Sequence, residues 1–99
     1  MNKTEFIKCV SQKSGVSEDI VREVLNAMTD VIVTCMLQRD RLVLRGFGSF
    51  YTSVVMAHDH LHPDTGKQVS MLPQLRMRFK PSKSVLRALK RISLKRDER

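Results

Sequence analysis

The sequence contains no tryptophan, one tyrosine and four phenylalanines among 99 residues. A chain of this length forms one domain and buries only about 60–65% of the surface that its unfolded form exposes. With so few large aromatic side chains, a single copy is expected to be marginally stable. A core shared between two copies would make up the deficit, so the composition favours a dimer.

The sequence has only two cysteines, Cys9 and Cys35, and both fall inside helical patterns. They lack the paired spacing of metal ligands, and a small secreted scaffold would carry more of them. We therefore expect two reduced, mostly buried thiols in a reducing, cytoplasmic compartment. The first residues contain no apolar stretch typical of a signal peptide, and no apolar run approaches the ~20 residues that a membrane span needs.

Acidic residues are outnumbered: 18 Lys and Arg stand against 10 Asp and Glu, which gives a net charge of +8, or twice that, +16, for a dimer. A charge of this size and sign indicates a polyanionic partner, namely DNA, RNA or an acidic membrane surface.

Two helices are predicted in the first part of the chain. The first covers residues 3–13, with Asn2 or Thr4 as its cap. Ser17 caps a longer second helix, in which apolar residues recur at helical spacing as far as Cys35, and residues 38–40 form its exit. This second apolar stripe is wide enough to need more than one neighbour, which again favours a dimer.

From Arg41 the hydrophobic period changes to two, as in a strand. Leu42 and Leu44 face one way, and Arg41 and Arg45 face the other. Residues 46–50, Gly-Phe-Gly-Ser-Phe, are predicted to form a hairpin turn, and a second strand follows to about Met56. Residues 57–66 contain no apolar pattern and should project as a loop or arm, which ends in a Pro-Asp-Thr-Gly turn.

A third strand is predicted over residues 67–80, with a bend at Pro73. Its two faces alternate: one is apolar (Val69, Met71, Leu75, Met77, Phe79) and the other is polar (Gln68, Ser70, Gln74, Arg76, Arg78, Lys80). A last helix should start at Pro81-Ser82, since proline favours the first turn. Its buried stripe is expected to contain Val85, Leu86, Leu89 and Ile92.

Arg76, Arg78 and Lys80 are the clearest candidates for binding a polyanion. They share one strand face, with no acidic residue between them, at a spacing of about 7 Å. That spacing is about twice the rise per phosphate of one DNA strand. Together with the net charge, this row favours nucleic acid over a plain solvated sheet face.

Other chemistries have weaker support. His58, His60 and His62 alternate, so an extended strand would point all three imidazoles the same way, and zinc binds imidazole. No cysteine lies nearby, and the favoured interpretation is a polar arm that becomes more basic below pH ~6.5, with no metal. Ser49 has no apparent His and Asp partners, so we expect neither an enzyme nor a cofactor.

Several motifs stand together in one order: two helices, Gly-Phe-Gly-Ser-Phe, Pro-Asp-Thr-Gly-Lys and Phe-Lys-Pro-Ser-Lys. In this combination the chain resembles the HU/integration host factor family of bacterial nucleoid proteins over about residues 1–92. The resemblance implies a single α+β domain over residues 1–99 that forms an intertwined dimer. Its parts would be a helical dimerisation half (1–38), a three-stranded antiparallel sheet (41–80) with an extended β-arm (54–74), and a C-terminal helix (82–94).

The resemblance also implies a function: low-specificity binding of duplex DNA, through its backbone and minor groove, with bending or compaction of the nucleoid. Pro63 would be the wedge at the arm tip, with His62 and Lys67 beside it. Phe47, Phe50 and Phe79 would fill the dimer core. The remaining contacts to DNA would come from Lys3, Gly46, Gly48, Arg76, Arg78, Lys80 and Lys83.

The arm differs from the family pattern, which usually has Arg before the proline and Asn beside it; here Leu61 and His62 stand in this region. Ser53, Val55 and His58 occupy positions of the outgoing strand where basic residues are common. A second hypothesis follows from these differences: an accessory or regulatory subunit whose more apolar arm contacts protein in a heterodimer or nucleoprotein complex.

Overall fold

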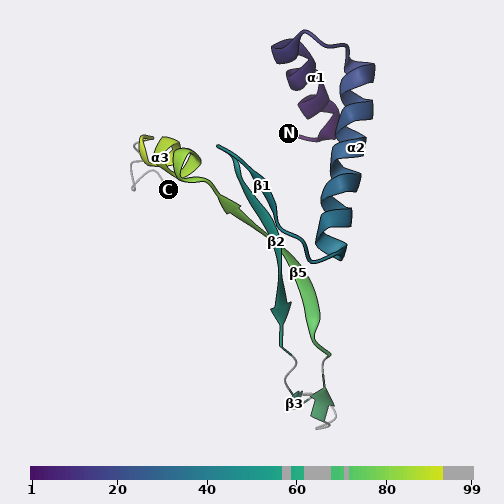
Figure 1. Cartoon of the computed structure of the whole chain (residues 1–99), viewed down its shortest axis with the longest axis vertical. Coiled ribbons are helices and arrows are strands. Elements are labelled where there is room, and N and C mark those ends of the chain that lie inside the picture. Colours follow the sequence, from purple (N-terminus) through teal and green to yellow (C-terminus); the bar gives the residue numbers. More distant parts are fainter. Residues whose placement is uncertain (57–58, 62–67, 71, 93–99) are drawn as a thin grey trace.

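Two antiparallel helices begin the structure, a computed structural model that describes residues 1–56, 59–61, 68–70 and 72–92 (Figure 1). α1 (Lys3–Ser14) starts with a capping box, in which the Asn2 side chain accepts from the Glu5 amide and the Glu5 carboxylate accepts from the Asn2 amide. α2 (Glu18–Leu37) is capped by Ser17, whose hydroxyl accepts from the Ile20 amide. Both helices agree with the predicted bounds.

α2 is followed by its cap Gln38 and then by Arg39, which has a left-handed backbone with φ of 56°. The Arg39 amide donates to the Met36 carbonyl, and the Asp40 amide donates to the Cys35 carbonyl. This pair of bonds is a Schellman motif, which normally places glycine where Arg39 stands. The exit predicted at residues 38–40 is therefore confirmed, although no glycine marked the left-handed position.

Three antiparallel strands follow, β1 (Leu42–Leu44), β2 (Gly48–Val55) and β5 (Gln74–Pro81), with β2 in the centre. The connection between β1 and β2 is only residues 45–47, and the Phe47 amide donates to the Leu44 carbonyl. The predicted turn over residues 46–50 was therefore too long. Gly48 to Phe50 already belong to β2, because they pair with Leu44 to Leu42.

A second, two-stranded sheet forms the arm, in which β3 (Asp59–Leu61) pairs antiparallel with β4 (Gln68–Ser70). Figure 1 shows it beyond the far ends of β2 and β5. The predicted loop over residues 57–66 thus contains a strand at 59–61. The predicted third strand is divided into β4 and β5, and Pro73 lies in the break, as the sequence indicated.

α3 (Lys83–Lys90) follows β5 directly. Its cap is Ser82, whose hydroxyl accepts from the Val85 amide, while Pro81 is the last residue of β5. The expectation that Pro81 opens this helix was therefore wrong: the proline ends a strand, and the serine begins the helix. A turn follows at Arg91, and the rest of the predicted helix to residue 94 lies outside the described residues.

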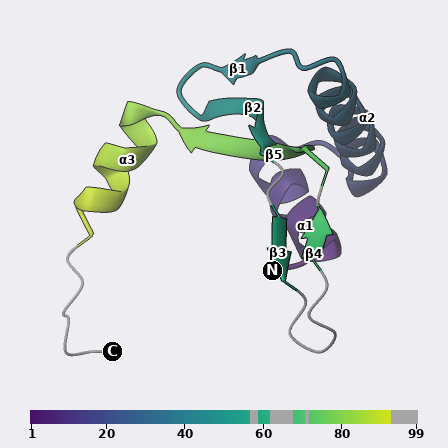
Figure 2. The ribbon, with the colours of Figure 1, turned by 90° about the horizontal axis from the view of Figure 1, so that it is seen from below.

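The chain has very little core of its own. Among the described residues, only three apolar side chains are buried: Ile7, Val21 and Met36. The radius of gyration is 19.7 Å, whereas a compact domain of this length would have about 13 Å. The elements are therefore held apart, as the views in Figures 1 and 2 show.

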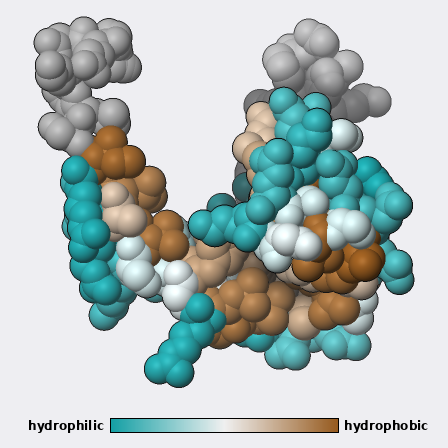
Figure 3. Space-filling view, turned by 90° about the horizontal axis from the view of Figure 1, so that it is seen from above, coloured by the Kyte–Doolittle hydropathy of each residue, from teal (hydrophilic) through white to brown (hydrophobic). Residues whose placement is uncertain are grey.

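Several side chains that were expected to be buried are exposed in the single chain. Leu86 and Leu89 of α3 are 43% and 58% exposed, and Ile92, just beyond the helix, is 61% exposed. Cys9 is exposed as well. In Figure 3 the hydrophobic side of α3 faces the rest of the molecule across an open space, and its hydrophilic side faces outward. The period of the stripe was predicted correctly, but this chain alone does not cover it.

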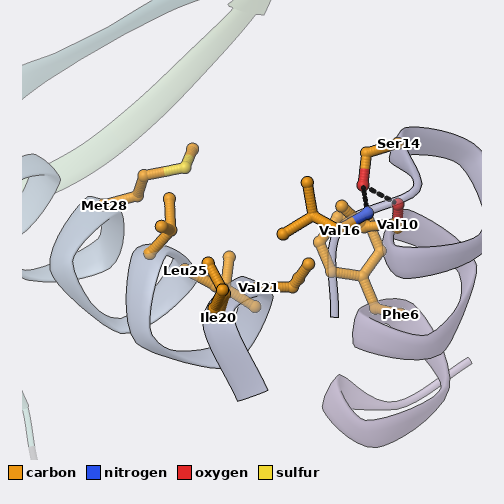
Figure 4. A pocket seen from close by; sticks show the side chains of 9 residues that line it. Phe6, Val10, Ser14, Val16, Ile20, Val21, Leu25 and Met28 are labelled. Carbon is orange, nitrogen blue, oxygen red and sulfur yellow. Dashed lines mark hydrogen bonds between the residues drawn. The ribbon is translucent and has the colours of Figure 1, made fainter. Parts of the chain in front are cut away.

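Two apolar hollows flank α2. One, of about 330 Å³, lies between α1 and α2 and is lined by side chains that include Phe6, Val10 and Leu25 (Figure 4). The other, of about 360 Å³, lies between α2 and β1, beside Val31 and Leu42. Neither α2 nor another described helix has the length and apolar character to cross a bilayer.

Candidate nucleic-acid interface

The pairing of β2 with β5 gives the main sheet one apolar face. Phe50 pairs with Phe79, Thr52 with Met77 and Val54 with Leu75. The Phe79 ring lies 4.9 Å from the Phe50 ring and 5.1 Å from the Phe47 ring, measured between centroids. These three predicted core phenylalanines thus form one cluster, in which Phe47 is 50% and Phe79 41% exposed.

The opposite face carries hydroxyls on β2 and cations on β5. Three successive pairs each join one hydroxyl residue to one basic residue: Ser49↔Lys80, Tyr51↔Arg78 and Ser53↔Arg76. All three cations are exposed. The predicted alternation of the third strand is confirmed here, and the register adds the row of hydroxyls, which strand alternation alone did not identify as part of the site.

Two contacts fix side chains on this basic face. The Arg41 guanidinium lies over the Tyr51 ring, 5.1 Å from its centroid, in a cation–π arrangement. The Arg78 Nε–H donates to the Ser53 hydroxyl over 3.2 Å. Neither contact was predicted. Strand alternation had only placed Arg41 on the other side of the strand from Leu42 and Leu44.

A groove of about 330 Å³ lies at the end of the sheet, between the β1–β2 turn and the start of α3. Four cationic residues line it: Arg41, Arg45, Lys80 and Lys83. The Ser82 amide donates to the Phe47 carbonyl and so ties the start of α3 to the turn. Cations and a helix N-terminus around one hollow make a favourable place for an anion.

The two glycines of the predicted motif have different structural roles. Gly46 is exposed in the turn with φ of 84°, which is a backbone conformation that favours glycine. Gly48 is buried, and a Cβ atom there would lie 2.5 Å from the Phe79 ring and 2.6 Å from the Lys80 carbonyl oxygen. Gly48 is therefore required by close packing rather than by a turn.

Charge is unevenly distributed along the chain. Residues 41–56 and 72–92 contain no Asp or Glu, while Arg and Lys stand at nine of these positions (Arg41, Arg45, Arg76, Arg78, Lys80, Lys83, Arg87, Lys90 and Arg91). Within the described part of the chain, the one ion pair joins Arg22 to Asp19 in α2. The cations of the sheet and α3 therefore have no acidic side chain beside them in these two segments.

The other predicted site residues lie elsewhere. Lys3 is in α1, where its amine donates to the Asn26 side chain of α2. His62, Pro63 and Lys67 fall outside the described residues, so their predicted roles stay predictions. Over the described ranges, no group of three or more His, Cys, Asp or Glu residues could hold a metal ion.

Comparison with known proteins gives a consistent result. The family model described as "Bacterial DNA-binding protein" matches residues 1–90. HU from Geobacillus stearothermophilus is 32% identical over 90 residues, which is 91% of this chain and all of that protein. HU-beta from Neisseria meningitidis is 29% identical over 89 residues, 90% of this chain and all of that protein.

A solved structure shows the same likeness. The cocrystal structure of Anabaena HU with DNA matches with a TM-score of 0.82 at 26% sequence identity, covering 90% of this chain and 97% of that one. The chain therefore belongs to the bacterial DNA-binding protein family, and the relatives described above are HU proteins. The predicted family and the predicted α+β fold are confirmed.

Proposed function

We propose that this protein is an architectural DNA-binding protein that binds duplex DNA with little sequence preference and bends or compacts it. The observation that carries the proposal is the basic face of β2 and β5, where Arg76, Arg78 and Lys80 stand exposed with no acid beside them in the sheet. Contacts of this kind meet phosphates, which carry no base information. The affinity is therefore mainly electrostatic.

The working form in this proposal is a dimer of identical or related chains. The exposed stripe of α3 and the hollows beside α2 support it, because a single chain leaves these faces in water. A second copy would cover them and bring two basic faces to one duplex. The proposed place of action is the nucleoid in the bacterial cytoplasm, and the proposed activity is binding without catalysis.

The groove between the β1–β2 turn and α3 extends the proposed interface. Lys83 and Lys80 line it together with the backbone of Gly46, so a phosphate at the edge of the bound duplex fits here. Lys3 adds a further phosphate contact if it exchanges its bond to Asn26. The arm completes the interface, with Pro63 as the wedge that the family pattern assigns to it.

The test compares two triple variants by fluorescence anisotropy of a labelled duplex. One removes the sheet cations (Arg76→Ala, Arg78→Ala, Lys80→Ala), and the other removes three cations of the helical half (Lys8→Ala, Lys13→Ala, Arg22→Ala). Both lower the net charge of the chain from +8 to +5. We expect the sheet variant to bind at least about 100-fold more weakly than the wild type, and the helical variant to lose far less.

The salt dependence gives an independent readout. With about 6–10 phosphates engaged, affinity should fall by a factor on the order of 10³ or more between low and physiological salt. Equal losses from the two triple variants would show that net charge alone attracts DNA. Pro63→Ala, measured in a DNA-bending assay, separates insertion of the arm from binding by the sheet.

A further inference from the structure

Ser53 is the one β2 hydroxyl that bonds to a cation of the basic face. Its oxygen accepts the Arg78 Nε–H over 3.2 Å. In the strand register Ser53 stands opposite Arg76, so this bond runs diagonally to the next basic residue along β5. Arg78 therefore leans along the sheet toward the arm.

The bond to Ser53 uses only the Nε–H of the Arg78 guanidinium. Arginine has five N–H donors in a fixed fork, and Ser53 takes only the one on Nε. Among the described residues, nothing accepts from the four donors on the two Nη atoms, and these can meet the oxygens of one phosphate in parallel. Arg78 is exposed and Ser53 is half-buried, so the serine holds the arginine while its charged end stays open to solvent.

The strand register also identifies the direct neighbour of Arg78. Tyr51 is the direct cross-strand partner of Arg78, and the Tyr51 ring is itself covered by the Arg41 guanidinium. No carboxylate in residues 41–56 or 72–92 competes for Arg78. The bond to Ser53 is thus the polar contact that selects the orientation of this side chain.

We propose that Ser53 is a positioning residue for DNA binding, which presents the Arg78 guanidinium to a backbone phosphate in its bound orientation. A freely rotating arginine loses side-chain freedom when it binds, and an arginine that is already held loses less of it. This inference rests on the proposed function. It adds Ser53, an uncharged residue that raises the affinity for DNA by holding Arg78 in place.

The experiment measures DNA affinity by anisotropy across a range of salt for Ser53→Ala, Ser53→Thr and Arg78→Lys, and for Ser53→Ala in the Arg78→Lys background. Ser53→Ala should weaken binding about threefold to tenfold. Its log–log salt slope should equal that of the wild type, because no cation has been removed. Ser53→Thr keeps the hydroxyl and should restore most of the affinity.

The double variant isolates the positioning role. Lysine has no guanidinium group, so it lacks the Nε–H that Arg78 donates to Ser53. Adding Ser53→Ala to Arg78→Lys should therefore change the DNA affinity by less than about twofold. Thermal melts of all variants, without DNA, should be alike because Ser53 lies on the open face of the sheet.

Three results overturn the inference. Ser53→Ala that binds as tightly as the wild type shows that Arg78 needs no support. Equal losses from Ser53→Ala with and without Arg78→Lys show that the serine acts independently of the arginine. Wild-type protein that does not bind duplex DNA at all overturns the proposed function itself, and it is recognised before any variant is compared.

Discussion

Arg39 has a left-handed backbone conformation, which is strained for any residue with a Cβ atom. With φ of 56° it closes the Schellman motif at the end of α2, where glycine would be free of strain. Arg39→Gly should therefore stabilise the protein by about 1 kcal/mol, as judged by urea or thermal unfolding. Gln38→Gly, one residue earlier at φ of −88°, is the matched control and should destabilise it. A loss of stability from Arg39→Gly would show that its side chain has a compensating contact.

Gly48 shows why residue patterns are ambiguous. Two glycines around Phe47 predicted a turn over residues 46–50, yet only Gly46 lies in the turn. Gly48 is needed because the Phe79 ring and the Lys80 carbonyl approach it from β5, 31 and 32 residues further along the chain. A local pattern contains no information about that distant neighbour. Gly48 was therefore predicted to lie in the turn, whereas close packing against β5 is the reason for the glycine.

At the scale of elements, the helices were predicted well because their signals are local. Asn2, Ser17 and Ser82 are true caps, and the apolar period of each helix is visible in the sequence. The contacts of the basic face were missed because they depend on how β2 and β5 align. Strand alternation placed Arg76, Arg78 and Lys80 on one face. Only the folded structure shows that Ser53 bonds to Arg78 across the strands and that Arg41 lies over Tyr51.

α3 allows a direct test at the same scale. Leu89 is 58% exposed in the single chain, and the proposed dimer covers this side of the helix. Leu89→Gln should weaken dimerisation by about tenfold to a hundredfold, because each dimer loses two buried apolar side chains. Lys90→Gln, on the next residue of the same helix, should leave the dimer dissociation constant nearly unchanged. Analytical ultracentrifugation measures both, and equal dissociation constants would place the interface elsewhere.

At the scale of the whole molecule, the single chain is open and buries few side chains. Among the described residues, the only buried apolar side chains are those of Ile7, Val21 and Met36, and the radius of gyration of 19.7 Å reflects elements that stand apart. If folding requires a partner chain, the melting temperature depends on protein concentration. Over a roughly hundredfold increase in concentration we expect it to rise by on the order of 5 °C, measured by calorimetry or circular dichroism. A constant melting temperature would indicate a monomer that is stable by itself.

The uneven distribution of charge also determines what a covered duplex would present to its surroundings. Residues 1–40 carry five basic side chains (Lys3, Lys8, Lys13, Arg22 and Arg39) and six acidic ones (Glu5, Glu18, Asp19, Glu23, Asp30 and Asp40), so their charges sum to −1. The main sheet and α3, in contrast, contain no acidic residue. When the basic face lies against DNA, this nearly neutral half would point outward, because α2 lies on the side of β1 that carries Leu42 and Leu44. Protein molecules bound side by side on one duplex would then repel one another little. Together they would also screen part of the phosphate charge of that duplex from a second duplex. Crowded occupancy and close approach of neighbouring DNA segments are thus compatible with a strongly cationic protein.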